Sequence, residues 1–256
     1  MSSISPPPAQ TGWVAAAPSL TMRAYFSSYH LWAAEHFAGL ARDIENAPGE
    51  KPRFDIQHRA YVVNAIFSSV AFLESSINEV FQDVVDDYQN RISSLGLDNK
   101  SRKIISVFWT LIEKHDASVV NKKLKTTIRK IINKELIKKN NNKGKNTPSD
   151  ILSKYQIFLI FCQKEQFDRG AQPYQSVKII IDLRNALTHY KPKSYVISVQ
   201  SSFDKKLQGK FPENPLMTGV NNPYFPDKCL GSGCAYWAFR ATKELADKFF
   251  QKLNSH

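Results

Sequence analysis

The sequence predicts an all-α fold, and three features of its pattern support this prediction. Most apolar residues recur at intervals of three and four positions, which is the spacing of one face of a helix. Glycine is scarce, with 10 residues in 256, so folds built on glycine-rich nucleotide loops are disfavoured. No internal repeat and no heptad array long enough for a coiled coil is present. We therefore expect one helical bundle over residues 20–256, preceded by a disordered Pro/Ser/Ala-rich tail over residues 1–19.

Two long helices are expected in the first third of the chain. Residues 20–46 form the first, which has an aromatic face and is ended by a turn that contains Pro48. Residues 56–90 form the second, which has the strongest apolar stripe of a core helix. The aromatic face of the first helix consists of Tyr25, Tyr29, Trp32 and His36, with Leu40 on the next turn. The stripe of the second consists of Ile66, Val70, Leu73, Ile77, Val80, Phe81 and Val84.

The rest of the chain contains shorter helices and one long loop. Ser149 or Asp150 can cap the helix near residue 150, and Pro192 prevents the helix that starts at residue 174 from continuing. Residues 193–233 form a long irregular loop before the last helix, with a possible short strand over residues 195–199. The expected helices cover residues 101–114, 119–139, 150–163, 174–190 and 234–253.

Basic residues are concentrated in one segment. The chain has a net charge of +12, and residues 121–145 contain ten Lys or Arg and one Glu, so this segment alone carries +9. A concentrated basic segment is typical of proteins that bind a polyanion such as RNA. We expect a basic helical insertion over about residues 115–148. The alternative is a solvated surface without a ligand. The lysines expected to contact RNA are Lys122, Lys123, Lys130 and Lys134.

Several classes of protein are disfavoured. No apolar run reaches the roughly 20 residues of a membrane span, and no charged start followed by an apolar stretch suggests a signal peptide. Three cysteines are too few for a disulfide framework, so a cytoplasmic protein without a membrane partner is expected. The zinc and nucleotide motifs HExxH, CxxC and GxxxxGK[ST] are absent, as is GxSxG, and we expect neither metal nor cofactor. Cys229 and Cys234 are expected to be packed thiols, and Gly231-Ser-Gly233 a turn that leads into the last helix.

One segment combines residues that suit phosphodiester chemistry. Arg184, Asn185 and His189 lie at the end of the helix expected over residues 174–190. Asn185 and His189 are four residues apart and share a face, whereas Arg184 and His189 are separated by about 140° around the helix axis. Arginine can stabilise a charged phosphorane, histidine can transfer a proton near neutral pH, and asparagine can orient either group. The alternative is that Arg184 and His189 only complement the helix dipole.

The spacing Arg184-Asn-x-x-x-His189 resembles the signature of the HEPN superfamily, in which an Arg and a following polar residue precede a His. The helix over residues 56–90 adds to the resemblance, because Glu74 and Asn78 match an inward-facing Glu and Asn of the family. The alternative for this pair is a solvated flank of the helix. The family fold is an all-α bundle. The resemblance covers residues 56–191 and the last helix, and omits the tail, the basic insertion and the long loop.

The resemblance implies a metal-independent endoribonuclease that cleaves RNA through attack by the ribose 2′-OH. Family members dimerise so that both Arg–His pairs line one cleft, and many are toxins or anti-phage defence effectors. By the same resemblance, Arg184 binds the scissile phosphate and His189 is the general acid or base. Asn185 orients either the phosphate or the His189 imidazole. Glu74 would hold Arg184, with Asn78 in a supporting role.

Some family members pair with an antitoxin that modifies a Tyr two residues after the motif His. Here Tyr190 follows His189 directly and position 191 is Lys, so the sequence departs from that pattern. An antitoxin or defence-complex partner stays an expectation. The main alternative is a non-catalytic HEPN-like adaptor subunit in such a complex. A nucleic-acid-binding regulator is a further alternative, supported by the basic insertion alone.

Overall fold

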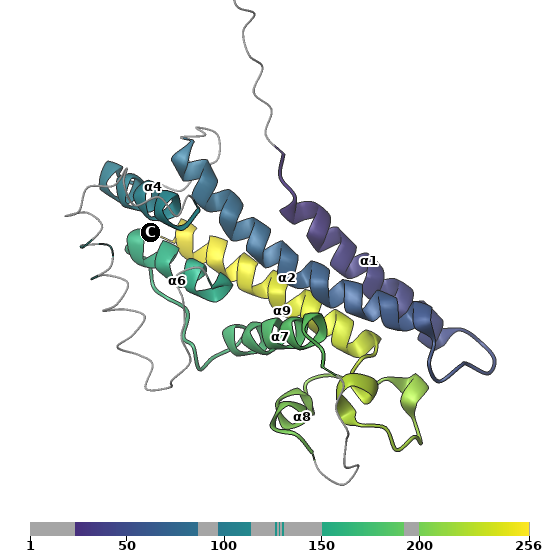
Figure 1. Cartoon of the computed structure of the whole chain (residues 1–256). Coiled ribbons are helices and arrows are strands. Elements are labelled where there is room, and N and C mark those ends of the chain that lie inside the picture. Colours follow the sequence, from purple (N-terminus) through teal and green to yellow (C-terminus); the bar gives the residue numbers. More distant parts are fainter. Residues whose placement is uncertain are drawn as a thin grey trace, which may run out of the picture.

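The computed structural model of the chain describes residues 24–86, 97–113, 150–191 and 200–255, together with Thr126, Ile128 and Lys130. Every regular element among these residues is a helix, which confirms the all-α prediction (Figure 1). The α-helices are α1 (Ser27–Asn46), α2 (Ile56–Val85), α4 (Asn99–Glu113), α6 (Ile151–Phe161), α7 (Tyr174–Thr188), α8 (Ser202–Leu207) and α9 (Ser232–Asn254). Two short turns complete the fold, the 3-10 helix η3 (Pro215–Met217) and the π-helix η4 (Tyr224–Lys228).

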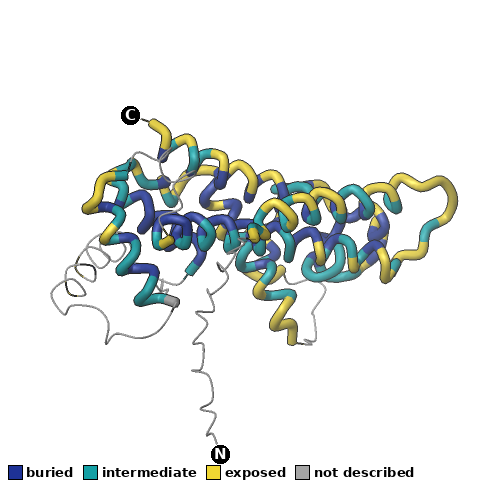
Figure 2. Tube along the Cα trace, turned by 90° about the horizontal axis from the view of Figure 1, so that it is seen from above, coloured by how far each residue is buried: buried dark blue, intermediate teal, exposed yellow. Residues whose placement is uncertain are grey.

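The three long helices α1, α2 and α9 form the body of the bundle, and each packs against the other two. Helices α4, α6 and α7 pack against α2, and α6 and α7 also contact α9 (Figure 1). Figure 2 shows buried positions along the middle of these helices and exposed positions in the loop between α1 and α2. The arrangement places α2 at the centre, as its apolar stripe predicts.

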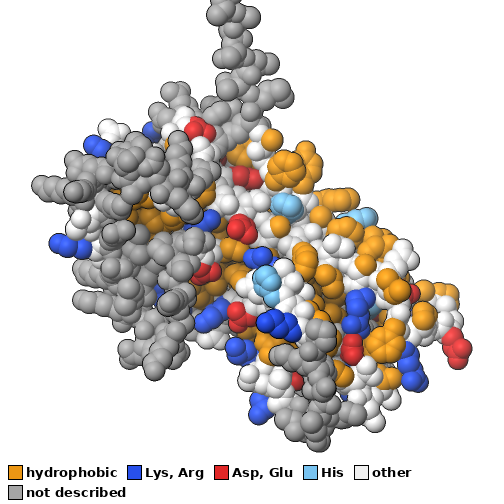
Figure 3. All heavy atoms as spheres, viewed as in Figure 1, with side chains coloured by type: hydrophobic (Ala, Val, Ile, Leu, Met, Phe, Trp, Pro, Cys, Tyr) orange, Lys and Arg blue, Asp and Glu red, His pale blue; other side chains and the backbone are white. Residues whose placement is uncertain are grey.

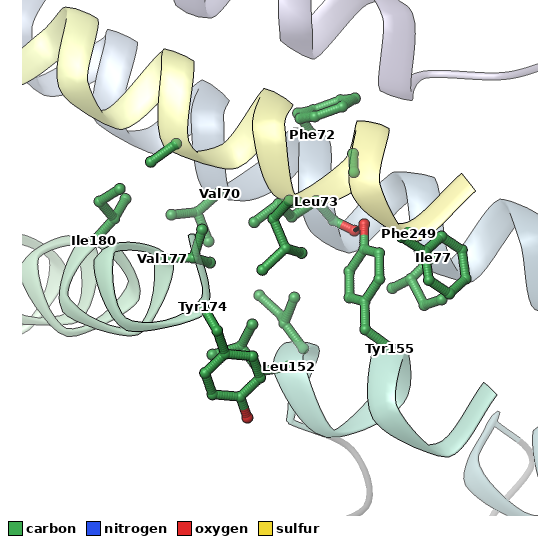
Figure 4. Packing of buried hydrophobic residues seen from close by; sticks show 14 of the residues in the cluster. Val70, Phe72, Leu73, Ile77, Leu152, Tyr155, Tyr174, Val177, Ile180 and Phe249 are labelled. Atoms are coloured by element: carbon green, nitrogen blue, oxygen red, sulfur yellow. Dashed lines mark hydrogen bonds between the residues drawn. The ribbon is translucent and has the colours of Figure 1, made fainter. Parts of the chain in front are cut away.

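The predicted stripe of α2 is the core of the protein. Residues Ile66, Leu73, Ile77 and Phe81 are fully buried. In Figure 4, side chains of α6, α7 and α9 meet this stripe at different levels: Val177 and Ile180 of α7 lie near Val70, whereas Tyr155 of α6 and Phe249 of α9 lie near Ile77. The Tyr155 hydroxyl donates a hydrogen bond to the Leu73 carbonyl oxygen at 3.0 Å, which satisfies a buried polar group.

The aromatic face of α1 points to solvent. Tyr29 and Trp32 are 68% and 64% exposed, while the small residues Ala34, Ala38 and Ala41 form the face that packs against α2 and α9. Small side chains allow close approach of helices, so this alanine face is buried and the larger aromatic side chains stay outside. Figure 3 shows hydrophobic side chains at the surface over α1.

Helix α1 begins at Ser27, later than the expected start at residue 20. The reason is a cap supplied by another helix: the Glu79 carboxylate of α2 accepts hydrogen bonds from the Phe26 and Ser27 backbone N–H groups, both at 2.8 Å. It also accepts one from the Ser27 hydroxyl at 2.6 Å. A carboxylate at this position satisfies the unpaired N–H groups of a helix start and complements the helix dipole.

The long loop contains more helix than expected. Its described part, residues 200–231, includes α8, η3 and η4. Helix α8 begins with a capping box in which Ser201 and Asp204 bond to each other's backbone N–H groups. The possible strand over residues 195–199, the tail over residues 1–19 and most of the basic insertion lie outside the described residues.

By length and composition, α2 could cross a membrane. No other helix of the described residues is long and apolar enough to do so. This finding differs from the expectation that the chain contains no segment of that kind. Half of its most apolar window is buried inside the bundle. A central core helix meets the same criteria of length and composition.

Candidate functional site

The candidate site lies at the C-terminal end of α7. Val177, Ile180 and Leu183 are fully buried and hold α7 against α2 and α9. The helix ends at Thr188, and His189 is its C-cap with φ −107° and ψ 32°. The His189 backbone N–H still donates to the Asn185 carbonyl oxygen at 2.9 Å, so the last turn is preserved. The structure therefore presents the predicted motif on a helix end that the core fixes in place.

The three motif side chains differ in burial. Asn185 and His189 are exposed, and Arg184 is half-buried with its Nε atom buried and without a hydrogen-bond partner. No hydrogen bond or ion pair to the described residues engages the His189 imidazole. A guanidinium with an unused N–H donor and an accessible imidazole could both bind an anion that approaches this helix end.

Tyr190 follows at the edge of the same site. It is 43% exposed, and its ring centroid lies 6.3 Å from that of Phe225 in η4. The ring therefore lies between the motif and the long loop, and its contact with Phe225 ties the residue after the motif to the described part of that loop.

Searches of protein-family models, curated proteins and solved structures find no match for this chain. The resemblance to the HEPN superfamily therefore rests on the motif residues of α2 and α7 and on no relative.

The expected contact between Glu74 and Arg184 is not formed. Helix α7 runs antiparallel to α2, and Val177 lies near Val70 (Figures 1 and 4). Arg184 therefore follows Val177 towards the N-terminal end of α2, whereas Glu74 follows Val70 towards the C-terminal end of α2. Glu74 is half-buried and has no hydrogen bond or ion pair to the described residues. The antiparallel direction of the two helices is the reason that this part of the prediction is wrong.

Asn78 contacts a different helix from the one expected. Its Oδ1 atom accepts a hydrogen bond from Nζ of the buried Lys154 in α6 at 2.8 Å. The same ammonium group lies 5.3 Å from the Trp109 ring centroid in α4. Asn78 therefore helps to accommodate a buried lysine between α2, α4 and α6 and does not reach the motif.

Of the four lysines expected to bind RNA, the structure describes only Lys130. It is exposed and helical, and Ile128 on the same segment is buried. The predicted amphipathic helix over residues 119–139 otherwise lies outside the described residues. Lys122, Lys123 and Lys134 lie outside the described residues.

A second polar cluster, which the sequence did not indicate, joins the ends of three helices. The Glu45 carboxylate accepts hydrogen bonds from His58 Nε2 at 2.7 Å and from the Ser232 backbone N–H at 2.6 Å, and it also accepts one from the Ser232 hydroxyl. Burial by itself raises the pKa of the Glu45 carboxyl, but these hydrogen bonds outweigh burial and hold the pKa below its usual value of 4.5. The side chains of His58 and Glu45 are only 2% and 7% exposed.

These residue types also occur in hydrolase triads, but the connections differ. In a triad the serine hydroxyl bonds to the imidazole, whereas Ser232 bonds to the carboxylate. The cluster is also closed to solvent. We therefore assign it a structural role.

The glycines around Ser232 permit a close approach of the long loop. A Cβ atom on Gly231 would lie 2.7 Å from the Asn214 Cα, and one on Gly233 would lie 2.8 Å from the Pro212 carbonyl oxygen. Gly231 is the N-cap of α9, so the expected turn into the last helix is confirmed. The Glu45 carboxylate already occupies this helix start, which leaves no place there for a phosphate.

The cysteines are free and unreactive in character. Cys229 and Cys234 are fully buried, which confirms the prediction of packed thiols, and burial raises the pKa of both. Burial also raises the pKa of the Cys162 thiol, to about 12. Across the described ranges, no group of three His, Cys, Asp or Glu side chains is arranged to hold a metal ion.

Proposed function

We propose that this chain is an endoribonuclease of the HEPN type that acts as a homodimer and needs no metal ion. The observation that carries the proposal is the end of α7, where Arg184 has an unused buried donor and the accessible His189 imidazole has no protein partner among the described residues. Polar groups that are left unsatisfied next to solvent are suited to bind a ligand, and here their chemistry fits a phosphodiester.

The proposed reaction starts with the ribose 2′-OH of the substrate. A base removes its proton, the 2′-oxygen attacks phosphorus, and the 5′-oxygen leaves with a proton from an acid. The products are a 2′,3′-cyclic phosphate and a 5′-OH end. Arg184 neutralises the non-bridging oxygens, whose charge grows in the transition state, and Asn185 orients the phosphate or the imidazole.

The dimer supplies the second proton-transfer group. One His189 can act either as base or as acid in a single step, so two α7 ends that meet across a two-fold axis provide both. Such a site is assembled only in the dimer. Expression of the chain would then arrest growth, as expected of a toxin or defence effector.

The direct test is cleavage of a single-stranded RNA by the purified chain in excess EDTA, followed by analysis of the product ends. We expect cleavage to continue and to leave 2′,3′-cyclic phosphate and 5′-OH ends. Loss of cleavage in EDTA, restored by Mg²⁺ or Mn²⁺, would overturn the proposal. Products with 3′-OH ends would overturn it as well.

The basic insertion would bind the RNA backbone in this proposal. Each neutralised phosphate releases counterions, so the logarithm of the affinity should fall with that of the salt concentration with a slope of about −0.7 per contact on a single strand. Replacing Lys122, Lys123, Lys130 and Lys134 with Gln should raise Kd and flatten the slope by roughly 1 to 3 units. Equal affinities and parallel slopes would instead make the insertion a solvated surface.

The exposed aromatic face of α1 favours a second candidate function, that of a non-catalytic adaptor. Phe26, Tyr29 and Trp32 are each at least 60% exposed, and aromatic residues are enriched in protein–protein interfaces. The two functions differ in a growth assay. If Trp32→Ala abolishes growth arrest while His189→Ala leaves it unchanged, the adaptor function is favoured.

A further inference from the structure

A groove with a volume of about 430 Å³ lies beside α9, apart from the motif. Its walls are the start of α7, residues 210–212 of the long loop and the outer face of the first half of α9. The volume is within the range of small-molecule sites, which is about 300 to 1,000 Å³. Ser176 in this groove and His189 in the motif are 13 positions apart, or about 20 Å along a helix.

One side of the groove offers an aromatic surface. The rings of Trp237 and Phe211 pack with their centroids 5.1 Å apart and their planes 41° apart, and Trp237 stays half-exposed. A tryptophan fixed by a neighbouring ring keeps its free face available, so a flat ligand ring can stack on it with little loss of conformational freedom.

The groove also carries positive charge that the described residues do not neutralise. Arg240 is exposed, and its guanidinium lies 5.5 Å from the Tyr236 ring centroid. One carboxylate, that of Glu244, also lines the groove, and it is paired with Lys248 at 2.7 Å. Neither Arg240 nor Lys210 has an acidic partner among the residues that the structure describes. Two unpaired cations beside an aromatic surface complement a ligand that has both an anionic group and a flat ring.

We propose that this groove binds a nucleoside monophosphate unit. The base stacks on Trp237 and the phosphate bonds to Lys210 and Arg240. Gln172 also lines the groove; its Oε1 atom accepts from the Ser176 backbone N–H at 3.3 Å, and its amide NH₂ group can donate to the base edge. The unit is either a free nucleotide or one nucleotide of a single-stranded RNA. Neither source requires cleavage at His189, so this inference does not depend on the proposed function.

The test is binding of two probes to the full-length chain by calorimetry. AMP represents the free nucleotide, and a short single-stranded RNA with 2′-O-methyl groups, which cannot be cleaved through the 2′-OH, represents the strand. Adenosine and ribose 5-phosphate are measured alongside, and we expect both to bind more weakly than AMP because each lacks one half of the ligand.

Arg240→Gln is the main variant because Arg240 is exposed and its loss should leave folding intact. We expect a roughly tenfold increase in Kd, the value of one charge-assisted hydrogen bond. The matched control is Lys243→Gln on the same helix, since Lys243 pairs with Asp247 and lies outside the groove. Trp237→Ala should raise Kd by roughly 5-fold to 100-fold, and Trp237→Phe by less, because the phenyl ring still stacks.

The two probes distinguish the sources. If AMP binds and the Arg240→Gln and Trp237→Phe variants weaken it, the groove is a site for a free nucleotide. If only the RNA responds to these variants, the groove is a nucleotide subsite along a strand. If Arg240→Gln and Trp237→Phe raise the Kd of neither probe more than Lys243→Gln does, the inference is wrong.

Discussion

Two regions of this molecule contain a histidine within a set of reactive residue types, and they differ in every other respect. At the junction of α1, α2 and α9, His58 is held by Glu45 at 2.7 Å and is closed to solvent. At the end of α7, His189 is exposed and Arg184, about one turn earlier on the same helix, is half-buried. The comparison teaches that residue type does not define a functional site. Access to solvent and unused hydrogen-bonding capacity are needed as well, and of these two regions only the end of α7 has both, which makes it the candidate site.

The closed cluster has a clear structural reason. A buried carboxylate is costly unless it is paired and hydrogen-bonded, and Glu45 has partners on α2 and α9. Its position at the first N–H groups of α9 is also favourable for a negative charge. Glu45 therefore ties the end of α1 to the starts of two other helices, with hydrogen bonds to both of its carboxylate oxygens.

The largest expected effect is on cleavage at the open region. Arg184→Ala should reduce the rate of RNA cleavage by about 10²-fold to 10³-fold, as loss of an oxyanion-stabilising donor does. Arg184→Lys should recover only part of the rate, since lysine keeps the charge and loses the fork of donors. Lys178→Ala, which removes an exposed cation from the same helix, is the control. A single-turnover assay measures all three, and equal rates for Arg184→Ala and Lys178→Ala would contradict the assignment.

At the closed region the expected effect is on stability. Glu45→Ala leaves His58 and the Ser232 N–H without their partner, and each buried polar group left without a hydrogen bond costs about 1–3 kcal/mol. Glu50→Ala serves as the control because Glu50 is exposed. Urea denaturation of both variants gives the difference. If the midpoint for Glu45→Ala equals that of the control, the cluster contributes nothing to stability.

The pH dependence of stability should identify the same cluster. Because the folded protein holds the pKa of Glu45 below its usual value of 4.5, the stabilisation is complete above that value. It is lost as the pH falls through the lower, folded-state pKa. The wild type should therefore lose more stability than Glu45→Gln when the pH is lowered from about 5 to about 3. Parallel curves of unfolding free energy against pH for the two proteins would rule out this linkage.

A smaller effect is expected from two glycines near the closed region. Gly231→Ala brings a Cβ to 2.7 Å from the Asn214 Cα and should destabilise the protein by about 1–3 kcal/mol. Gly39→Ala in α1 meets only the Tyr236 hydroxyl at 3.6 Å and should stabilise it by about 0.5–1 kcal/mol. Thermal unfolding of the two variants measures both changes, and we expect a lower Tm for Gly231→Ala and a higher Tm for Gly39→Ala. The same sign for both variants would show that close approach of the loop does not determine the effect.

The sequence predicts the parts of this fold that depend on local pattern. The stripe of α2 and the ends of α7 and α9 follow from periodicity and from turn residues, and the structure agrees within a few residues. The start of α1 could not be predicted because its cap, Glu79, is more than 50 residues away in sequence. The orientation of α1 was equally hidden, since α1 has one face of aromatic residues and one of alanines, and the local pattern does not show which of them packs.

The same distinction applies to the site. The motif Arg184-Asn185-x-x-x-His189 is local, so the sequence locates it at the end of a helix and the structure agrees. The expected support from Glu74 and Asn78 depends on how α2 and α7 are aligned, and no local pattern specifies that alignment. The Glu45–His58–Ser232 cluster joins residues up to 187 positions apart, so nothing in the sequence pattern could indicate it.

The central claim is that the open histidine serves catalysis and the closed one serves the fold. The most direct measurement compares His189→Ala with His58→Ala in both RNA cleavage in EDTA and urea unfolding. We predict that His189→Ala reduces cleavage by about 10²-fold to 10⁴-fold with an unchanged unfolding midpoint. His58→Ala should lower the midpoint while each folded molecule still cleaves RNA. Normal cleavage by His189→Ala, at any stability, would contradict the account.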